Sequence, residues 1–599
     1  MFSIRNLFQG LAKSSNIPTH FKSSYPRLNY LNNFPKAFST STEFSPLYKE
    51  ALDKYTQGVE LSNQKKYTES IALFEQVLQS FSKQQDKALL PLNEVNLLLQ
   101  AHFQLGKIHE KHQDIKRAAQ LYDDAFDIVN KTSLNNTVEA ANLHNALGRI
   151  KLKQGQNEEA KNYLNKASQI FKQVDTKDLT GSSQFVENAY MMAVLYGDSG
   201  QIDEALSLLE NILKQVKNQE ATYEGELDLA LVYLSVGNMY ISKKNVQKAL
   251  DYWQQGLESS IKRHGEHSLQ GQHYCLGVTQ VLLRHELFEQ AKKYAEKNLE
   301  IVQKLFAENH PKVAEGYLMM GVISFNTQNA GKALECYGKA AEILSSYPDQ
   351  YHDQVSFAHL TISEIYVAQG KYDEAKSAFE NALKIAILNL GEKSIKVADY
   401  YYFWAEQLRV KIDNFKGARQ YYTRALDIYK NNKETPLEVL VPCYYNLGSL
   451  NFHEGNVEEA INNLHETITN ALRLEEPSGL LEDTYNLLAS IYFQKQNYKE
   501  SAKYFQSAVD ESFKTGNKGE VDVYYRNLGL AHEYSGDIEK GVEGYRKALD
   551  LALKSRGKEQ EITQSHLQLL IEGLKKQNKL NEAEKLRVLY EHKSHHHDH

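Results

Sequence analysis

A small residue that returns about every 42 positions is the feature that most constrains the fold of this chain. Consecutive members of the series are 40 to 48 residues apart, and each is Ala, Ser or Gly. A period of this length is typical of arrays in which one supersecondary unit repeats and stacks on its neighbours. The thirteen positions are Ser70, Ala118, Ala160, Ala205, Ala249, Ala291, Ala333, Ala375, Ala418, Ala460, Ser501, Gly541 and Ala583.

Three other positions recur at fixed distances from the small residues of this series, as residues 315–344 illustrate. Twelve residues before Ala333 stands another small residue, Gly321; four residues after it stands Tyr337, and seven after it Ala340. Antiparallel helices approach closely only where the facing side chains are small, and a large residue one turn later fills the space beside the contact. The pattern therefore predicts an all-α solenoid of about thirteen antiparallel helix pairs that stack around one continuous core.

The spacing of these small, aromatic and alanine positions resembles that of the tetratricopeptide repeat (TPR) family, over residues 46–592. The repeat exceeds the usual 34 residues and so resembles the kinesin-light-chain type, as do the linkers HGEHS (264–268) and ENHPKVA (308–314). The first and last repeats depart most from the pattern, as expected of caps. The resemblance implies a superhelix whose concave surface, lined by the first helix of each pair, binds a peptide or a helix of another protein.

The first 42 residues form a separate segment because they contain no Asp or Glu. The opening MFSIRNLFQGLAK places Ile4, Leu7, Phe8 and Leu11 on one helical face, with basic residues elsewhere. We therefore expect residues 1–38 to be a mitochondrial presequence, which predicts a matrix location, with 39–45 as a linker. KAFSTS (36–41) resembles a matrix-processing site. The alternatives are a disordered tail that is not cleaved, and a cytoplasmic protein.

The sequence carries no catalytic, cofactor or metal motif of a known kind. It has no phosphate-binding GxxxxGK[ST] loop, no GxSxG and no HExxH, and its three cysteines stand far apart without a CxxC. The segment 593–599 is rich in histidine, but we interpret it as a disordered tail rather than a metal site. We therefore predict a protein that is not an enzyme and that has no cofactor.

Charge and hydropathy restrict the partners. The net charge is −7, and removal of the five basic residues of 1–38 makes it −12. Because RNA-reading solenoids need a basic surface, nucleic acid is disfavoured as a partner. No run of about 18 apolar residues predicts a transmembrane helix, although association with a membrane-bound complex is compatible with the sequence.

The concave surface is the predicted binding site. Asn446 and Asn527 each precede a small Gly by two residues, where peptide-binding TPRs often carry Asn, and an amide can both donate to and accept from a peptide backbone. Tyrosine adds contact area at low entropic cost. The alternative for the tyrosines is packing between repeats. The predicted partner-binding residues are Tyr402, Glu406, Tyr445, Asn446, Ser449, Asn486, Ser490, Arg526 and Asn527.

The predicted function is a non-catalytic mitochondrial scaffold or adaptor that binds other proteins, for example during assembly of a large mitochondrial complex. Two alternatives remain open at this point. The chain could be a permanent structural subunit of such a complex, or a cytosolic cargo adaptor of the kinesin-light-chain kind. Fold alone does not choose between them.

Overall fold

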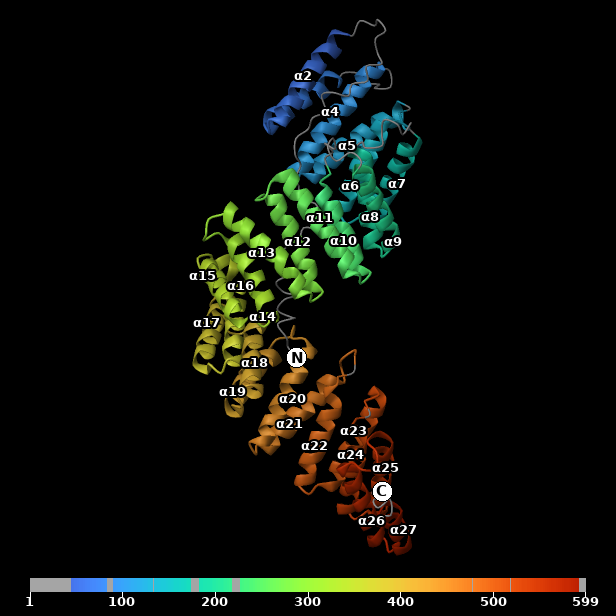
Figure 1. Ribbon diagram of the computed structural model, residues 1–599, viewed down its shortest axis with the longest axis vertical. Helices are drawn as coiled ribbons and strands as arrows, with labels where there is room; N and C mark the ends of the chain where they lie inside the picture. Colours follow the sequence, from blue (N-terminus) through green and yellow to red (C-terminus); the bar gives the residue numbers. More distant parts are fainter. Residues whose placement is uncertain are drawn as a thin grey trace, which may run out of the picture. The chain divides into compact units, whose positions relative to one another are not determined.

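The computed structural model describes residues 45–82, 90–132, 134–173, 183–217, 227–476, 478–517 and 519–591. These residues form 26 α-helices and no strand, which confirms the all-α prediction (Figure 1). The predicted presequence (1–38) and histidine-rich tail (593–599) lie outside the described residues. Among the described helices, none is both long and apolar enough to cross a membrane.

The helices follow one another as thirteen antiparallel pairs, in two compact units that meet in the sequence at Leu344. The unit before it holds α2 (Pro46–Asn63), α3 (Tyr67–Ser80), α4 (Leu92–Lys111), α5 (Ile115–Lys131), α6 (Val138–Lys153), α7 (Asn157–Gln173), α8 (Ser183–Asp198), α9 (Ile202–Lys217), α10 (Leu229–Ser242), α11 (Val246–His264), α12 (Leu269–Arg284), α13 (Phe288–Leu305), α14 (Pro311–Asn326) and α15 (Ala330–Leu344). The second unit holds α16 (Pro348–Ala368), α17 (Tyr372–Leu390), α18 (Ile395–Val410), α19 (Phe415–Asn431), α20 (Leu437–His453), α21 (Val457–Ala471), α22 (Leu480–Gln494), α23 (Tyr498–Thr515), α24 (Val521–Tyr534), α25 (Ile538–Ser555), α26 (Glu561–Lys576) and α27 (Leu580–Glu591).

The two helices of a pair touch at the small residues, as predicted. The twelve Ala and Ser residues of the series are at most 1 % exposed, and Gly541 is buried as well. Where a serine takes one of the two positions, its hydroxyl spans the contact. Ser70 Oγ donates to the carbonyl of Gly58 at 2.7 Å, and Ser501 Oγ donates to that of Ala489 at 2.8 Å. At these two serines, the second helix therefore contacts the backbone of the first helix directly.

The large residue four positions later lies over the small residue of the first helix. A methyl group added to Gly106 would come within 2.5 Å of the Tyr122 ring, and one added to Gly321 within 3.1 Å of the Tyr337 ring. These rings are buried, so the space that the glycine leaves is filled. The spacing in the sequence thus reflects one packing arrangement that most pairs repeat.

Every turn within a pair contains one residue in the left-handed conformation, five positions before the small residue of the second helix. Glycine occupies five of these positions, and Lys, Gln, Glu, Asp or Asn occupies the other eight. A side chain in this conformation costs about 1–2 kcal/mol relative to the right-handed region. The close contact of the two helices therefore holds eight turns in a conformation that their own residues disfavour. The non-glycine positions are Lys65, Gln113, Lys244, Glu286, Gln328, Asp413, Gln496 and Asn578.

Candidate protein-binding surface

The predicted binding residues lie on α18, α20, α22 and α24, which are the first helices of four consecutive pairs in the second unit. First helices of adjacent pairs also contact one another, as α20 does with α22. In Figure 1 these helices follow one another from the gold α18 through the orange α20 and α22 to the red-orange α24. We call the half-buried side chains that these four helices carry from Tyr402 to Asn527 the first-helix surface.

Glu406 is the centre of a polar network at one end of this surface. Its carboxylate accepts hydrogen bonds from the Tyr422 hydroxyl, from Arg409 Nη2 at 2.9 Å and from Asn446 Nδ2 at 2.9 Å. Arg409 Nε also donates to the Tyr422 hydroxyl at 3.1 Å. Charge-assisted bonds of this kind are the stronger ones in proteins, so the network fixes α18, α19 and α20 relative to one another.

Burial and the Glu406 charge keep the tyrosines of this network neutral. Tyr402 is 5 % exposed, and burial raises its pKa well above the usual value, with a further contribution from Glu406. The same two causes raise the pKa of Tyr422. Burial lowers the pKa of the Arg409 guanidinium, but its bonds to Tyr422 and Glu406 outweigh that effect, so the pKa is raised. Tyr402 therefore acts mainly within the packing, as the alternative reading of the tyrosines had it.

The network engages the amide N–H groups of Asn446 but not its amide oxygen. Besides its bond to Glu406, Asn446 Nδ2 lies 3.2 Å from the Tyr402 hydroxyl and 3.3 Å from that of Tyr422. Among the described contacts, none uses the amide oxygen of Asn446, and this oxygen is not buried. Asn446 is thus held in place to accept a hydrogen bond from a partner, while its two N–H donors face Glu406 and the hydroxyls of Tyr402 and Tyr422.

Asn527 shows the reverse arrangement, two pairs further along. Its amide oxygen accepts hydrogen bonds from Arg526 Nε at 3.1 Å and from Arg526 Nη2 at 3.0 Å. The amide nitrogen of Asn527 donates in none of the described contacts. The sequence predicted that each asparagine would donate and accept at once; the structure instead divides the two roles between Asn446 and Asn527.

The remaining four predicted residues lie on α20 and α22 and are half-buried. Tyr445 packs against the core that α21 and α22 share, and burial raises its pKa. Ser490 Oγ donates to the carbonyl of Asn486 within α22, at 2.9 Å. Ser449 has no hydrogen-bond partner among the described residues. The structure thus brings Tyr402, Glu406 and Asn446 together, whereas the others are spread along the surface.

Sequence reasoning missed two members of the network, Arg409 and Tyr422. In the sequence, Tyr422 is the large residue four positions after Ala418, a position that the repeat pattern assigns to filling space between helices. The pattern gave no sign that its hydroxyl would reach Glu406. Arg409 lies three residues after Glu406 on the same helix, so an ion pair between neighbouring turns could have been proposed from that spacing.

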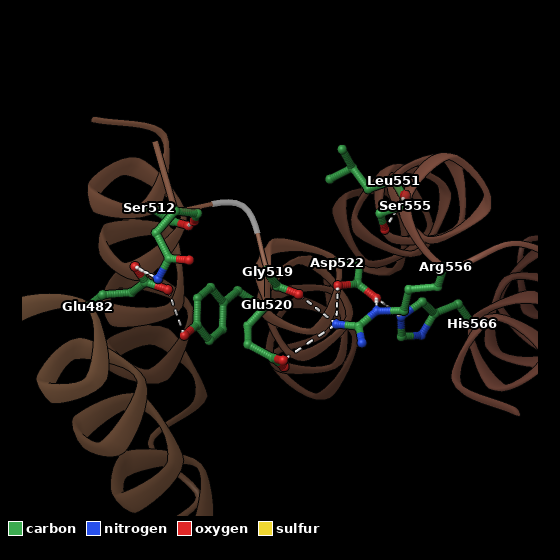
Figure 2. A network of polar contacts seen from close by, with 11 residues as sticks. Glu482, Ser512, Gly519, Glu520, Asp522, Leu551, Ser555, Arg556 and His566 are labelled. Atoms are coloured by element: carbon green, nitrogen blue, oxygen red, sulfur yellow. Dashed lines mark hydrogen bonds and ion pairs between the residues drawn. The ribbon is translucent and has the colours of Figure 1, made fainter. Parts of the chain in front are cut away.

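Another polar network joins the N-terminal ends of the first helices in the last pairs (Figure 2). Arg556 donates to both carboxylate oxygens of Asp522 at 3.0 Å, and His566 lies 3.2 Å from the same carboxylate. Glu482 accepts from the Tyr524 hydroxyl at 3.0 Å. Acidic residues are stabilised at the first turn of a helix by its dipole. Because the contacts cross from one pair to the next, this network fixes the stacking of repeats.

The first unit has a buried ion network that the sequence did not predict. Arg149 of α6 lies between two carboxylates, with Nε 2.8 Å from Glu110 of α4 and Nη1 2.6 Å from Glu187 of α8. Lys153 adds a contact of 2.5 Å to Glu110. Burial raises the pKa of Glu110, but the two cations outweigh it and bring that pKa to about 2. The network therefore links three consecutive first helices by charge.

One group of side chains has the spacing of metal ligands, but the ammonium group of a lysine already contacts both of its carboxylates. Glu266, His267 and Glu300 place one ligand atom each within 4.8 Å of the others. The ammonium group of Lys297 lies 3.0 Å from both glutamates, and His267 Nε2 lies 2.7 Å from Glu300. A bound cation would have to displace Lys297, so we assign no metal to this group.

Comparison with known proteins agrees with this architecture. The family model described as tetratricopeptide repeat matches residues 97–173, 312–387, 354–431 and 440–510. The chain is 22 % identical over 397 residues to Protein KINESIN LIGHT CHAIN-RELATED 2 of Arabidopsis thaliana, covering 65 % of this chain and 59 % of that protein. It is 21 % identical over 362 residues to Protein KINESIN LIGHT CHAIN-RELATED 3 of the same plant, covering 60 % and 55 %. The chain thus matches less than two thirds of the length of these relatives.

Among solved structures, the apo form of RapI superposes with a TM-score of 0.38 and 13 % identity, covering 62 % of this chain and 99 % of RapI. The family match and the similarity to the kinesin light chain-related sequences both lie in the repeats. The chain therefore carries tetratricopeptide repeats in these segments, and its repeats are similar to those of the kinesin light chain-related proteins.

Proposed function

We propose that this chain is a non-catalytic mitochondrial scaffold that binds an extended segment of another protein along the first-helix surface. The observation that carries the proposal is the division of roles between Asn446 and Asn527. An extended backbone presents N–H and C=O groups in alternation. The free amide oxygen of Asn446 suits an N–H of the partner, and the free amide nitrogen of Asn527 suits a C=O.

The fixed position of Asn446 supports this role. Its amide is already bound to Glu406, which is in turn held by Arg409 and Tyr422. A group that is held before binding loses little conformational freedom when the partner arrives, and this favours affinity. Between the two asparagines, Tyr445 and Ser449 offer half-buried surface for the partner's side chains.

The experiment is a comparison of partner recovery by tagged chains. The chain would be expressed in mitochondria with the changes Asn446→Ala and Asn527→Ala, and gently solubilised complexes would be separated on native gels with mass spectrometry of each slice. The control is Asn462→Ala, which removes an exposed asparagine from the second helix α21. We expect the double variant to lose partner but to remain folded, with about 1–2 kcal/mol of stability lost with the bond between Asn446 and Glu406. Equal recovery from the double variant and the control would refute the proposal.

Replacing only Asn527 tests the direction of its hydrogen bond. Asn527→Asp keeps the oxygen that accepts from Arg526 but replaces the free donor with a second acceptor. We expect recovery to fall as far as with Asn527→Ala. If Asn527→Asp bound the partner as well as the unchanged chain, the donor role of Asn527 would be wrong.

The mitochondrial part of the proposal rests on residues 1–38 and has its own test. Deletion of these residues should leave the protein in the cytosol, and isolated mitochondria should import the full chain and shorten it. An unchanged location after deletion would favour the alternative of a cytosolic cargo adaptor. Migration with one large complex at a fixed ratio would instead favour a permanent subunit.

A further inference from the structure

Glu364 on α16 is a half-buried carboxylate that has no partner among the described residues. Its oxygen Oε2 is buried and accepts no hydrogen bond, whereas its oxygen Oε1 is not buried. Taking a charged group out of water is costly unless the group is paired or hydrogen-bonded. The unbound chain therefore holds a carboxylate at a place that lacks the counter-ion it requires.

The other carboxylates of this kind in the second unit are all bound. Its six first helices (α16, α18, α20, α22, α24 and α26) carry seven Asp or Glu side chains that are buried or half-buried. Six of the seven contact a cation or a hydroxyl: Asp353 contacts Lys396, Asp399 contacts Tyr429, Glu406 contacts Arg409, Glu482 contacts Tyr524, Asp522 contacts Arg556, and Glu533 contacts Lys576. Glu364 is the seventh, so its isolation is an exception within this unit.

The electrostatics of Glu364 follow from this isolation. Burial raises the pKa of its carboxyl to about 7, although the charge of Lys411 acts in the opposite direction. Lys411 is exposed at the end of α18 and forms no ion pair among the described residues. A cation that contacted Oε1 would favour the ionised carboxylate. This position therefore suits a positively charged ligand.

Glu364 lies on the side of the helices that carries the predicted binding residues. It stands eleven residues before Ala375, the small residue of its pair. Ser449 and Ser490 likewise stand eleven residues before the small residues of their own pairs. Because the repeats share one register, equivalent positions lie on equivalent faces of the first helices. Glu364 is thus the charged member of this series on the first helix that precedes the first-helix surface.

One extended segment can reach Glu364 and both asparagines. Glu364, Asn446 and Asn527 lie on α16, α20 and α24, which are alternate first helices. Packed helices lie about 8–10 Å apart, so the four steps from α16 to α24 span about 32–40 Å. This is the length of about ten to twelve residues of extended chain.

We infer that Glu364 binds a lysine or arginine side chain of the partner segment. The inference rests on the proposed function, because it assumes that an extended segment lies along the first-helix surface. Oε1 accepts a charge-assisted hydrogen bond from the basic group, which supplies the missing counter-ion. A divalent metal ion would need more oxygen ligands than this carboxylate provides, and among the described residues Glu364 belongs to no group with the spacing of metal ligands. The partner segment therefore carries a basic residue near the end that passes over α16.

The test is selection of phage-displayed random peptides of about 16 residues, which exceed the required span, on the full chain. The pH is slightly above neutral, so that Glu364 is largely ionised. We expect the selected peptides to share a Lys or Arg toward one end. A synthetic peptide of this sequence should bind Glu364→Gln about tenfold more weakly. The control is Glu374→Gln, which makes the same chemical change at an exposed position of α17 and should bind the peptide normally.

A charge reversal separates direct contact from an effect on folding. Selection on Glu364→Lys should yield peptides with Asp or Glu where the unchanged chain selects Lys or Arg. Glu364→Gln removes a charge that burial disfavours, so this variant should remain folded. Peptides that require Asn446 and Asn527 but bind Glu364→Gln as tightly as the unchanged chain would overturn this inference alone. An unchanged chain that enriches no peptide would overturn both this inference and the proposed function.

Discussion

The contact between Gly237 and Trp253 allows a single methyl group to test the packing rule. By this rule, a small residue on the first helix of a pair makes room for a large residue on the second. Gly237 lies on α10, and a Cβ added there would be 2.1 Å from Trp253 Nε1 and 2.5 Å from Cδ1 of the same ring. Trp253 is fully buried on α11, and its Nε1 donates to the carbonyl of Leu234 at 3.2 Å. Gly237→Ala must therefore displace the indole ring within a closed core.

The net effect follows from three opposing contributions. Overpacking a filled core costs about 1–3 kcal/mol. Loss of the indole hydrogen bond to Leu234 costs about 1 kcal/mol more if the ring turns away. Alanine favours the helix over glycine by about 1 kcal/mol. We therefore expect Gly237→Ala to destabilise the surrounding repeats by about 1–3 kcal/mol.

The assay is urea unfolding followed by the fluorescence of Trp253. The chain has two tryptophans, so Trp404→Phe leaves Trp253 as the only reporter. A local reporter is needed because long repeat arrays do not unfold in one step. In this background, Gly237→Ala should move the midpoint to lower urea concentration.

Gly277→Ala is the matched control. Gly277 also lies on a first helix, α12, but an added methyl group would have its nearest neighbour at 3.5 Å, the Cδ2 atom of Leu234. Because these contact distances are ordinary, the higher helix propensity of alanine should dominate. The urea midpoint of Gly277→Ala should therefore rise slightly above that of its parent. A midpoint for Gly237→Ala at or above that of its parent would refute the packing rule.

Three further predictions concern the stability of the first unit. Arg149→Met leaves Glu110 without its main counter-ion in a buried place, so we expect a loss of about 3–5 kcal/mol in urea unfolding; a loss below 1 kcal/mol would contradict the buried network. Glu286→Gly relieves a left-handed residue (φ 59°) and should raise the melting temperature, by up to about 1 kcal/mol of stability, whereas a lower melting temperature would contradict the strain. Burial, helped by the charge of Lys166, lowers the pKa of His144 from 6.5 to about 4. The unfolded chain therefore binds more protons in this range, and stability should fall as pH decreases from 6.5 to 4. The melting temperature of His144→Phe should fall less over this range, and equal falls would exclude His144 as the cause.

The repeat could be predicted from the sequence because small residues cannot be replaced where two backbones nearly touch. Gly321, Ala333 and Tyr337 keep their spacing since all three take part in one contact. The left-handed turns could not be predicted in the same way. Glycine at positions 286 and 328 would have indicated a left-handed turn, but the chain has Glu286 and Gln328 there. The contact between the two helices of the pair holds these residues in the left-handed conformation.

The sequence placed the candidate binding residues on their helices, but it did not predict their contacts. The register correctly placed Asn446 on a first helix, because helical periodicity determines which residues share a face. Which of its hydrogen bonds remain free depends on Glu406, forty residues earlier, and on the direction of each side chain. The same holds for Arg149, whose partners lie 39 residues before it and 38 after it. Contacts between repeats arise from stacking, which the pattern within one repeat does not encode.

The stacking of one helix pair on the next also determines how the chain should respond to a pulling force. Within each unit, a pair contacts mainly the pairs before and after it, so a load on the two ends of a unit would be carried through its pairs in series. Under such a load, pairs would detach one at a time, because freeing one leaves most contacts of the others intact. Each event would release about 42 residues, or about 140 Å of extended chain. Such a unit can therefore lengthen in steps while its remaining helix pairs stay folded.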